Sequence, residues 1–461
     1  MDRRQFLGTI AGAAAASAQA TKPNFVIIYT DDQGIGDLGC YFGRDIMKTP
    51  HIDALAASGI RFTDWHTNSP VCSPSRAAVL TGKYPQNAGV PHILTSKPDF
   101  NVPGLRQGEN TIASELKKLG YRTAAVGKWH LGSARGSRPM DQGFDEWFGF
   151  YSGWTDYYSH RYYTLGGTPL FHDMWRGENE VFEEPMYQTE LLGREAKAFL
   201  NRQPAGQPFF LYLAFGAPHY PMMAPKKYLD RFPVTADRDR REHAAMVAAI
   251  GELDQAGAAA LVRRIDDQVG EIVATLKARG LDRNTVIFYQ ADNGATREER
   301  ADHRGRPYRG GSNGPYRAYK GSLFEGGTRV PGLLRWPAKI KPNQVLDGIG
   351  MAMDILPTFV KWAGGKPPAG VDGVDLTPMV LEGKPSVHDV VFWDYDTMRA
   401  VRRGHWKLIR NYREGLGTPM VRELWLSDLR EDPGENRNFA YSQPELVKEL
   451  TVLMDAWKPE Q

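Results

Sequence analysis

Two pairs of oxygen-bearing side chains, far apart in the sequence, could together bind a divalent cation. Asp31 and Asp32 form one pair, and Asp292 and Asn293 form the other. All four offer only oxygen ligands and three are carboxylates, which favours Ca²⁺, with Mg²⁺ as second choice, over zinc. Two adjacent carboxylates in a crevice repel each other unless a cation lies between them. These residues therefore predict a calcium or magnesium site.

Three further side chains have the chemistry of acid–base catalysis or anion binding. Lys128, His130 and His219, like the two pairs above, come just after short apolar runs. A single polar residue in such a place is usually a turn residue or a helix cap. Seven polar residues at the ends of four runs are harder to explain in that way, so we expect them to form one site.

The apolar runs have the length and composition of buried parallel strands. They cover Asn24–Thr30, Tyr121–Val126, Pro208–Phe215 and Thr285–Ala291. Helical patterns lie between them over Asn110–Gly120, Glu190–Leu200 and Ala256–Gly280. This alternation predicts an α/β fold with a large, mostly parallel sheet sandwiched by helices. Ligands of such sheets bind beyond the carboxyl ends of the strands, where the seven residues would converge.

The pattern changes in the last quarter of the chain, beyond Lys366. Short alternating runs over Val387–Tyr395, Met398–Arg403 and His405–Arg410 predict an antiparallel sheet, and Pro444–Trp457 predicts a terminal helix. We therefore expect a catalytic α/β domain over residues 21–365 and a smaller C-terminal subdomain over residues 366–461.

The first twenty residues have the pattern of a cleavable secretory signal. Arg3 and Arg4 precede a short Ala-rich stretch that ends at Ala20. The stretch is too short to span a bilayer, and no later run approaches that length, so we expect no membrane span. The two arginines also fit the twin-arginine type of signal, which exports folded proteins. The sequence thus predicts export, to the periplasm or the medium.

Composition excludes several other classes of protein. The 461 residues are 41% hydrophobic and 24% charged, which is ordinary for a globular chain. The balance of 57 Lys+Arg against 54 Asp+Glu lacks the basic excess of a nucleic-acid-binding protein. The two cysteines, Cys40 and Cys72, could form one disulfide, remain buried thiols, or include one with a chemical role.

Cys72 begins the most specific motif in the chain, Cys72-Ser-Pro-Ser-Arg76, which runs into a short helix ending at Gly82. This motif resembles the signature of the sulfatase family. Other features of that family follow in order at Gly127–Gly132, Gly143–Gly149, Lys320-Gly321 and Glu423–Leu429. The resemblance covers essentially the whole mature chain. Residues 156–160 most resemble the arylsulfatase branch that contains N-acetylgalactosamine 4-sulfatase.

The resemblance implies an alkaline phosphatase-like fold and a modified cysteine. In the family, a formylglycine-generating or sulfatase-maturating enzyme oxidises the cysteine to formylglycine (3-oxoalanine), whose hydrate supplies the nucleophilic oxygen. By this resemblance, Cys72 is the precursor of the nucleophile and joins Asp31, Asp32, Asp292 and Asn293 as a metal ligand.

The resemblance also implies a role for each remaining polar residue. Arg76 and Lys128 would stabilise the aldehyde hydrate and the metal environment, and Lys320 would bind the sulfate. His219 would protonate the departing alcohol, and His130 would help to expel sulfate and regenerate the aldehyde.

Residues 151–187 are rich in aromatic and histidine side chains without clear periodicity. Aromatic faces with polar tips suit a sugar-binding cleft, and Tyr157, Tyr158 and His160 are the candidate substrate contacts. Packing beneath a long loop is an equally good interpretation.

Together these patterns predict an exported, calcium-dependent sulfatase acting on carbohydrate sulfate esters. The nearest alternative is a phosphomonoester or phosphonate hydrolase on the same fold, because tetrahedral oxyanions can share such a metal site. An inactive protein that binds sulfated glycans is the non-enzymatic alternative. Cys72 in its motif favours sulfate, and none of the expected core residues is missing.

Overall fold

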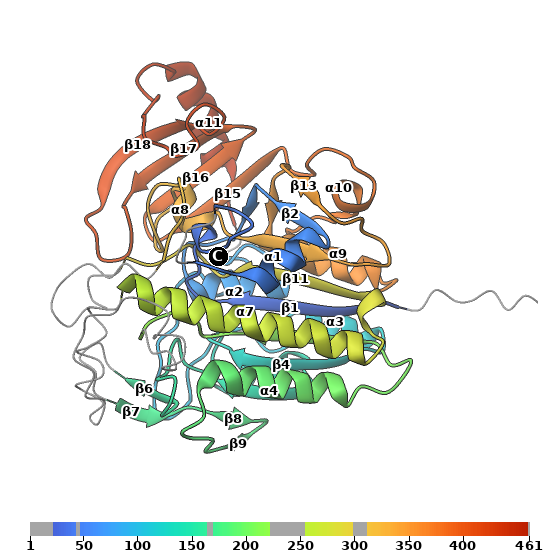
Figure 1. Cartoon of the computed structure of the whole chain (residues 1–461). Helices are drawn as coiled ribbons and strands as arrows, with labels where there is room; N and C mark the ends of the chain where they lie inside the picture. Colours follow the sequence, from blue (N-terminus) through green and yellow to red (C-terminus); the bar gives the residue numbers. More distant parts are fainter. Residues whose placement is uncertain (1–21, 43–46, 164–168, 222–253, 298–310, 460–461) are drawn as a thin grey trace, which may run out of the picture.

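The computed structural model describes residues 22–42, 47–163, 169–221, 254–297 and 311–459. The signal sequence expected over residues 1–20 lies outside these ranges. A ten-stranded sheet runs through the molecule (Figure 1). In spatial order its strands are β13 (Gln344–Leu346), β2 (Ile60–Phe62), β12 (Gly332–Arg335), β11 (Thr285–Ala291), β1 (Asn24–Thr30), β10 (Phe209–Ala214), β4 (Arg122–Lys128), β5 (Glu146–Phe150), β8 (Trp175–Arg176) and β9 (Asn179–Glu180).

The five central strands, from β11 to β5, are all parallel. Among the described strands of this sheet, antiparallel pairs occur only toward the two edges, where β12 pairs with β11 and β2, and β8 pairs with β5 and β9. The predicted α/β class with a mostly parallel sheet is therefore confirmed.

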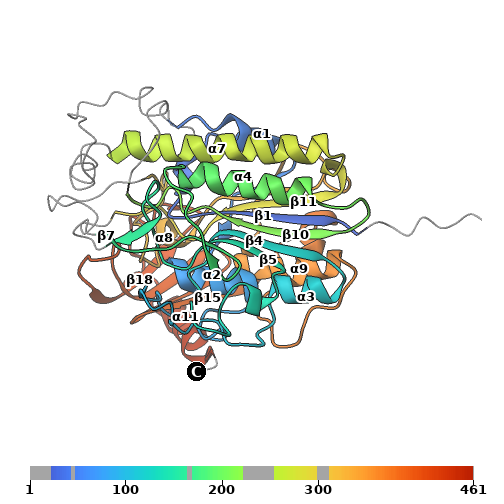
Figure 2. The ribbon, with the colours of Figure 1, turned by 90° about the horizontal axis from the view of Figure 1, so that it is seen from below.

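Helices cover both faces of this sheet (Figure 2). One face carries α1 (Pro50–Ala57), α4 (Gln188–Asn201) and α7 (Asp254–Ala278); the other carries α2 (Cys72–Thr81), α3 (Ile112–Lys118) and α9 (Ile355–Trp362). Every residue of strand β1 is buried because both faces of the strand are covered. Val26 and Ile28 pack toward α4 and α7, whereas Phe25 and Ile27 pack toward α3 and α9.

The elements predicted from sequence in this domain are all present. β1 and β11 have the predicted bounds, and the ends of α3, α4, α7, β4 and β10 differ from the prediction by at most two residues. The shorter elements were not predicted, because two to four residues carry no periodic signal. They include β3 (Trp65–His66), β6 (Arg161–Tyr163), β7 (Pro169–His172), β14 (Gly350–Met351) and α8 (Glu325–Thr328).

The C-terminal part forms a separate antiparallel sheet with a helix on one face. Its strands are β15 (Val390–Tyr395), β16 (Met398–Arg403), β17 (Trp406–Tyr412) and β18 (Val421–Asp428), and α11 (Pro444–Ala456) covers it. β18 was not predicted as a strand, because its first half is largely exposed and lacks alternation. The short helix α10 (Thr377–Leu381) packs into the core around α9, so the antiparallel unit begins after it, at β15.

Among the described residues, no helix is both long and apolar enough to cross a bilayer.

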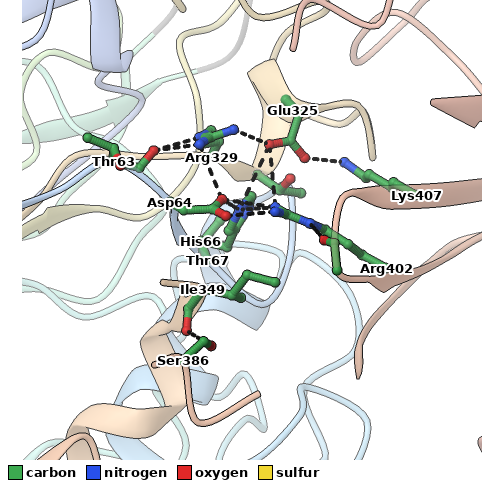
Figure 3. Close-up of polar contacts among 12 residues, drawn as sticks. Thr63, Asp64, His66, Thr67, Glu325, Arg329, Ile349, Ser386, Arg402 and Lys407 are labelled. Atoms are coloured by element: carbon green, nitrogen blue, oxygen red, sulfur yellow. Dashed lines mark hydrogen bonds and ion pairs between the residues drawn. The ribbon is translucent and has the colours of Figure 1, made fainter. Parts of the chain in front are cut away.

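A buried network of charges joins the C-terminal sheet to the large domain (Figure 3). Asp64, between β2 and β3, accepts two hydrogen bonds from the Arg402 guanidinium of β16, at 2.6 and 2.9 Å. Glu325, at the start of α8, accepts from Lys407 of β17 at 2.8 Å and from Arg329 at 2.9 Å. Burial alone would raise the pKa of Asp64, but Arg329 and Arg402 hold it well below its usual value. Both acids are therefore buried as carboxylates. Each is paired with one basic side chain of the C-terminal sheet.

Removing a cation from this network should destabilise the protein. We expect Arg402→Ala to cost about 3–5 kcal/mol, because it leaves a buried carboxylate partly uncompensated. The neighbouring Arg403 is a matched control: it pairs at the surface with Glu449, so Arg403→Ala should cost about 1 kcal/mol or less. Thermal unfolding of the two variants checks the difference. Equal losses of stability would show that the buried network does not hold the two units together.

Candidate active site

The strand order of the large sheet brings the predicted polar residues together. β11, β1, β10 and β4 are adjacent and parallel, so their carboxyl ends lie side by side. Site residues lie at or just after the carboxyl end of each strand. Asp31 and Asp32 follow β1, and Asp292 and Asn293 follow β11. Lys128 ends β4, His130 lies two residues beyond it, and His219 follows β10. One side-chain ligand atom from each of Asp31, Asp32, Cys72 and Asp292 lies within 4.8 Å of the others.

Cys72 is the first residue of α2, which is buried along its whole length. Its Sγ lies 3.6 Å from Asp31 Oδ1. Burial raises the pKa of the Cys72 thiol, so an unmodified cysteine here stays protonated and is a poor nucleophile. Cys40 and Cys72 are both free, so the disulfide considered from the sequence is not formed.

Each carboxylate of the site has its own cation. Lys128 Nζ lies 2.6 Å from Asp31 Oδ2, and Lys320 Nζ lies 2.9 Å from Asp32 Oδ2. The Arg76 guanidinium donates to Asp292 Oδ2 at 2.7 Å. All six side chains are at most 3% exposed. Each of the three buried acidic side chains thus has one buried basic partner.

The site has an unused oxygen that fits a bound cation. Asn293 donates through Nδ2 to Asp32 Oδ1 at 2.8 Å, while its buried Oδ1 has no hydrogen-bond partner among the described residues. Burial, together with the charge of Asp292, raises the pKa of Asp31 to about 8. An unpaired amide oxygen beside three crowded carboxylates is the donor set of a hard cation such as Ca²⁺ or Mg²⁺. These residues therefore fit the metal predicted from the sequence.

The two histidines of the site have opposite ring orientations. His219 Nδ1 lies 2.8 Å from the Tyr220 carbonyl oxygen, which only accepts, so Nδ1 carries the ring proton. His219 Nε2 then faces Asp32 Oδ2 at 3.6 Å. His130 Nε2 lies 3.0 Å from the Leu94 carbonyl oxygen, so its lone pair is on Nδ1, which has no partner among the described residues. Burial and the nearby lysines hold the pKa of both rings well below the usual value. Both are neutral before substrate binds.

Several neighbours of these residues were not identified from the sequence. The Leu94 carbonyl orients His130, and Asn313 holds the turn before Lys320 through bonds to Ala295 and Ala318. Both belong to loops without a sequence pattern. Trp154 belongs to the aromatic-rich segment, but the sequence did not identify it individually. Its ring lies parallel to that of His219, with ring centroids 5.8 Å apart.

The three predicted substrate contacts have different surroundings. Tyr157 is 2% exposed, and its hydroxyl lies 2.8 Å from the His219 carbonyl oxygen and 3.0 Å from that of Gly216. Tyr157 thus supports the turn that carries His219. His160 is fully buried, and Tyr158 is partly buried against Tyr187.

Comparisons with known proteins agree with this geometry. The sulfatase family model matches residues 23–365, and a model described as "N-sulphoglucosamine sulphohydrolase, C-terminal" matches residues 315–457. N-acetylgalactosamine-6-sulfatase of Rattus norvegicus is 36% identical over 86% of this chain and 72% of its own length. Arylsulfatase J of Mus musculus is 29% identical over 95% of this chain and 76% of its own length.

A solved structure shows the same fold over almost the whole chain. Ps i-CgsB, crystallised in complex with k-i-k-neocarrahexaose, superposes with a TM-score of 0.79 at 29% identity and covers 95% of both chains. The family model covers well over half of the residues, including all the strands whose ends form the site. The chain therefore belongs to the sulfatase family and is a sulfuric ester hydrolase.

Proposed function

We propose that this sulfatase removes sulfate from carbohydrate esters, with a nucleophile made by oxidation of Cys72 and a bound calcium ion. The observation that carries the proposal is the position of Cys72 Sγ, 3.6 Å from Asp31 within a cluster of three carboxylates. A thiol kept protonated by burial is a poor nucleophile, and in the sulfatase family a maturation enzyme converts this cysteine to formylglycine. Asp31, Asp32, Asp292 and Asn293 would hold the calcium ion, which would supply Lewis-acid chemistry next to the attacking oxygen of the formylglycine hydrate.

The charge balance of the site supports an anionic substrate. Asp31, Asp32 and Asp292 each contact one buried basic side chain, Lys128, Lys320 and Arg76 respectively. A divalent cation adds two positive charges, which attract a sulfate monoester and the negative charge that develops during its cleavage.

The positions of the three basic side chains indicate different roles for them. Lys128 and Arg76 are fully buried against Asp31 and Asp292, so they set the charge around the residue derived from Cys72. Lys320 lies outside the helices and strands and contacts Asp32, which suits it to bind the sulfate as a point charge.

His219 is suited to be the acid for the leaving alcohol. Its Nε2 faces the site while Nδ1 is held by the Tyr220 carbonyl oxygen. The ring is neutral in the free site, and the negative charge of a bound sulfate ester would raise its pKa and favour protonation. His130, with its free Nδ1, would accept a proton when sulfate is released.

Carbohydrate is the proposed leaving group because of what surrounds His219. Trp154 stacks on the His219 ring, and Tyr162 lies 4.9 Å from Trp154, centroid to centroid. Such aromatic surfaces suit sugar rings. The names of two relatives refer to saccharides, N-acetylgalactosamine and a neocarrahexaose. Export through the N-terminal signal, by the twin-arginine or the general secretory route, is part of the same proposal.

The first prediction from the proposed function is that Cys72 is modified. Peptide mass spectrometry of active protein should show the aldehyde or its hydrate at position 72, because the buried thiol cannot perform the reaction. Cys40→Ser is the matched control and should leave both the modification and the activity unchanged. Full activity in protein whose Cys72 is entirely unmodified would refute the mechanism.

The second prediction concerns the metal. Asp31→Asn should lose bound calcium and nearly all activity while the fold persists, because it removes one anionic oxygen ligand without changing volume. Elemental analysis and thermal unfolding measure the two effects. Asp375→Asn, at a surface pair with Lys361, is the control and should keep its calcium. Retention of a full equivalent of calcium by Asp31→Asn would place the ion elsewhere.

The third prediction separates leaving-group protonation from sulfate binding. His219→Ala should lower kcat/KM for a sugar sulfate by about 10²–10⁴-fold and for an activated aryl sulfate far less, because an aryl alcohol leaves without a proton. Lys320→Ala should lower both by similar factors, because both substrates carry the same sulfate. If His219→Ala reduced both substrates equally, His130 would be the better candidate for the acid. An aryl phosphate tested alongside should be the poorer substrate; a preference for it would favour the phosphohydrolase alternative.

A further inference from the structure

The aromatic-rich segment between β5 and α4 contains a second cluster of ligand-type side chains. His160 precedes β6, His172 ends β7, and Glu184 lies in the loop before α4. One candidate ligand atom from each lies within 4.8 Å of the others. His160 is a predicted substrate contact, whereas His172 and Glu184 have no role in the sulfate site described above.

The hydrogen bonds of the two imidazoles leave one ring nitrogen of each with a lone pair. His160 Nε2 lies 3.0 Å from the Met186 carbonyl oxygen, which only accepts, so Nε2 carries the proton. His160 Nδ1 is then a lone pair, and it has no hydrogen-bond partner among the described residues although the side chain is fully buried. His172 Nδ1 lies 2.8 Å from Glu180 Oε1 and carries its proton for the same reason.

The remaining nitrogen of His172 faces an acid. His172 Nε2 is buried, has no hydrogen-bond partner among the described residues, and lies 3.3 Å from Glu184 Oε1. A lone pair opposite a carboxylate is repulsive unless a proton or a metal ion lies between them. A proton on His172 Nε2 would satisfy Glu184 but would leave His160 Nδ1 unpaired, whereas a metal ion would satisfy all three groups.

We propose that His160 Nδ1, His172 Nε2 and the Glu184 carboxylate bind a zinc ion, with water in the fourth position. Two imidazoles and a carboxylate are a common donor set for zinc, and nitrogen donors disfavour calcium. Bonds of 2.0–2.1 Å in a tetrahedron separate neighbouring ligand atoms by about 3.3 Å, which matches the distance from His172 to Glu184. Metal-binding histidines also donate their other N–H to a carbonyl or carboxylate, as Met186 and Glu180 accept here.

The zinc would fix one wall of the sulfate site. It would tie the hairpin of β6 and β7 to the chain that enters α4. Tyr162 of that hairpin packs on Trp154, which stacks on His219. This consequence for substrate recognition rests on the proposed function, whereas zinc binding itself does not.

Metal content tests the binding directly. Full-length protein without a polyhistidine tag, dialysed against micromolar zinc, should hold one equivalent of zinc besides its calcium. His160→Ala and His172→Ala should each lose the zinc and keep the calcium, and Asp31→Asn should do the reverse. His405→Ala, at a partly exposed histidine of the C-terminal unit, should keep both metals. A full equivalent of zinc in His172→Ala would overturn the proposal.

A titration of the unmodified chain covers the case in which a variant fails to fold. Zinc-free wild-type protein should bind one equivalent of Co²⁺ and develop the visible absorption bands of a tetrahedral site, which zinc then abolishes. Glu180→Ala should weaken the affinity about 10–100-fold, because it removes the partner that orients His172. No saturable binding by wild-type protein would show that His172 is simply protonated between the two glutamates. Because these readouts do not depend on turnover, they stand apart from any failure of the proposed sulfatase substrate.

Discussion

The structure depends on compensating three carboxylates that are buried together at the ends of adjacent parallel strands. Asp31, Asp32 and Asp292 are nearly inaccessible to water, and burying such charges is costly unless each is paired. Lys128, Lys320 and Arg76 provide the pairs, from three different parts of the chain. The large sheet, covered by helices on both faces, is what holds these strand ends in one place.

The same principle recurs where the two units meet. Asp64 and Glu325 belong to the large domain, and the cations that neutralise them, Arg402 and Lys407, come from the C-terminal sheet. Phe324, next to Glu325, packs against Tyr412 and Trp425 of that sheet. Only a few residues separate Glu325 from Lys320, so the C-terminal unit supports the loop that delivers Lys320 to the sulfate site.

The sequence alone predicted the centre of the fold well. β1 and β11 could be predicted to the residue because strands buried on both faces are continuous apolar runs that stop at polar residues. Convergence of Asp31 with Asp292 then followed from the rule for parallel sheets. Lys320 follows no predicted strand, and its role came only from the family resemblance.

Other features could not be predicted, for physical reasons. β6 to β9 are too short to show a hydrophobic period, so the secondary structure of the aromatic-rich segment could not be predicted from the sequence. Tyr157 and His160 are both buried, and aromatic residues serve packing as readily as recognition, so their contact with substrate stays a prediction. The approach of His160 to His172 and Glu184 depends on a hairpin and a loop whose pairing carries no local sequence signal.

The central claim is that the compensated carboxylate cluster is a calcium site built around the residue derived from Cys72. Anomalous diffraction from a calcium-loaded crystal tests it most directly. The account predicts one strong peak within about 2.3–2.6 Å of oxygens from Asp31, Asp32, Asp292 and Asn293, beside an oxygen rather than a sulfur at position 72. A calcium-saturated crystal with no ion in this cluster, or with an intact Cys72 thiol in fully active protein, would contradict it.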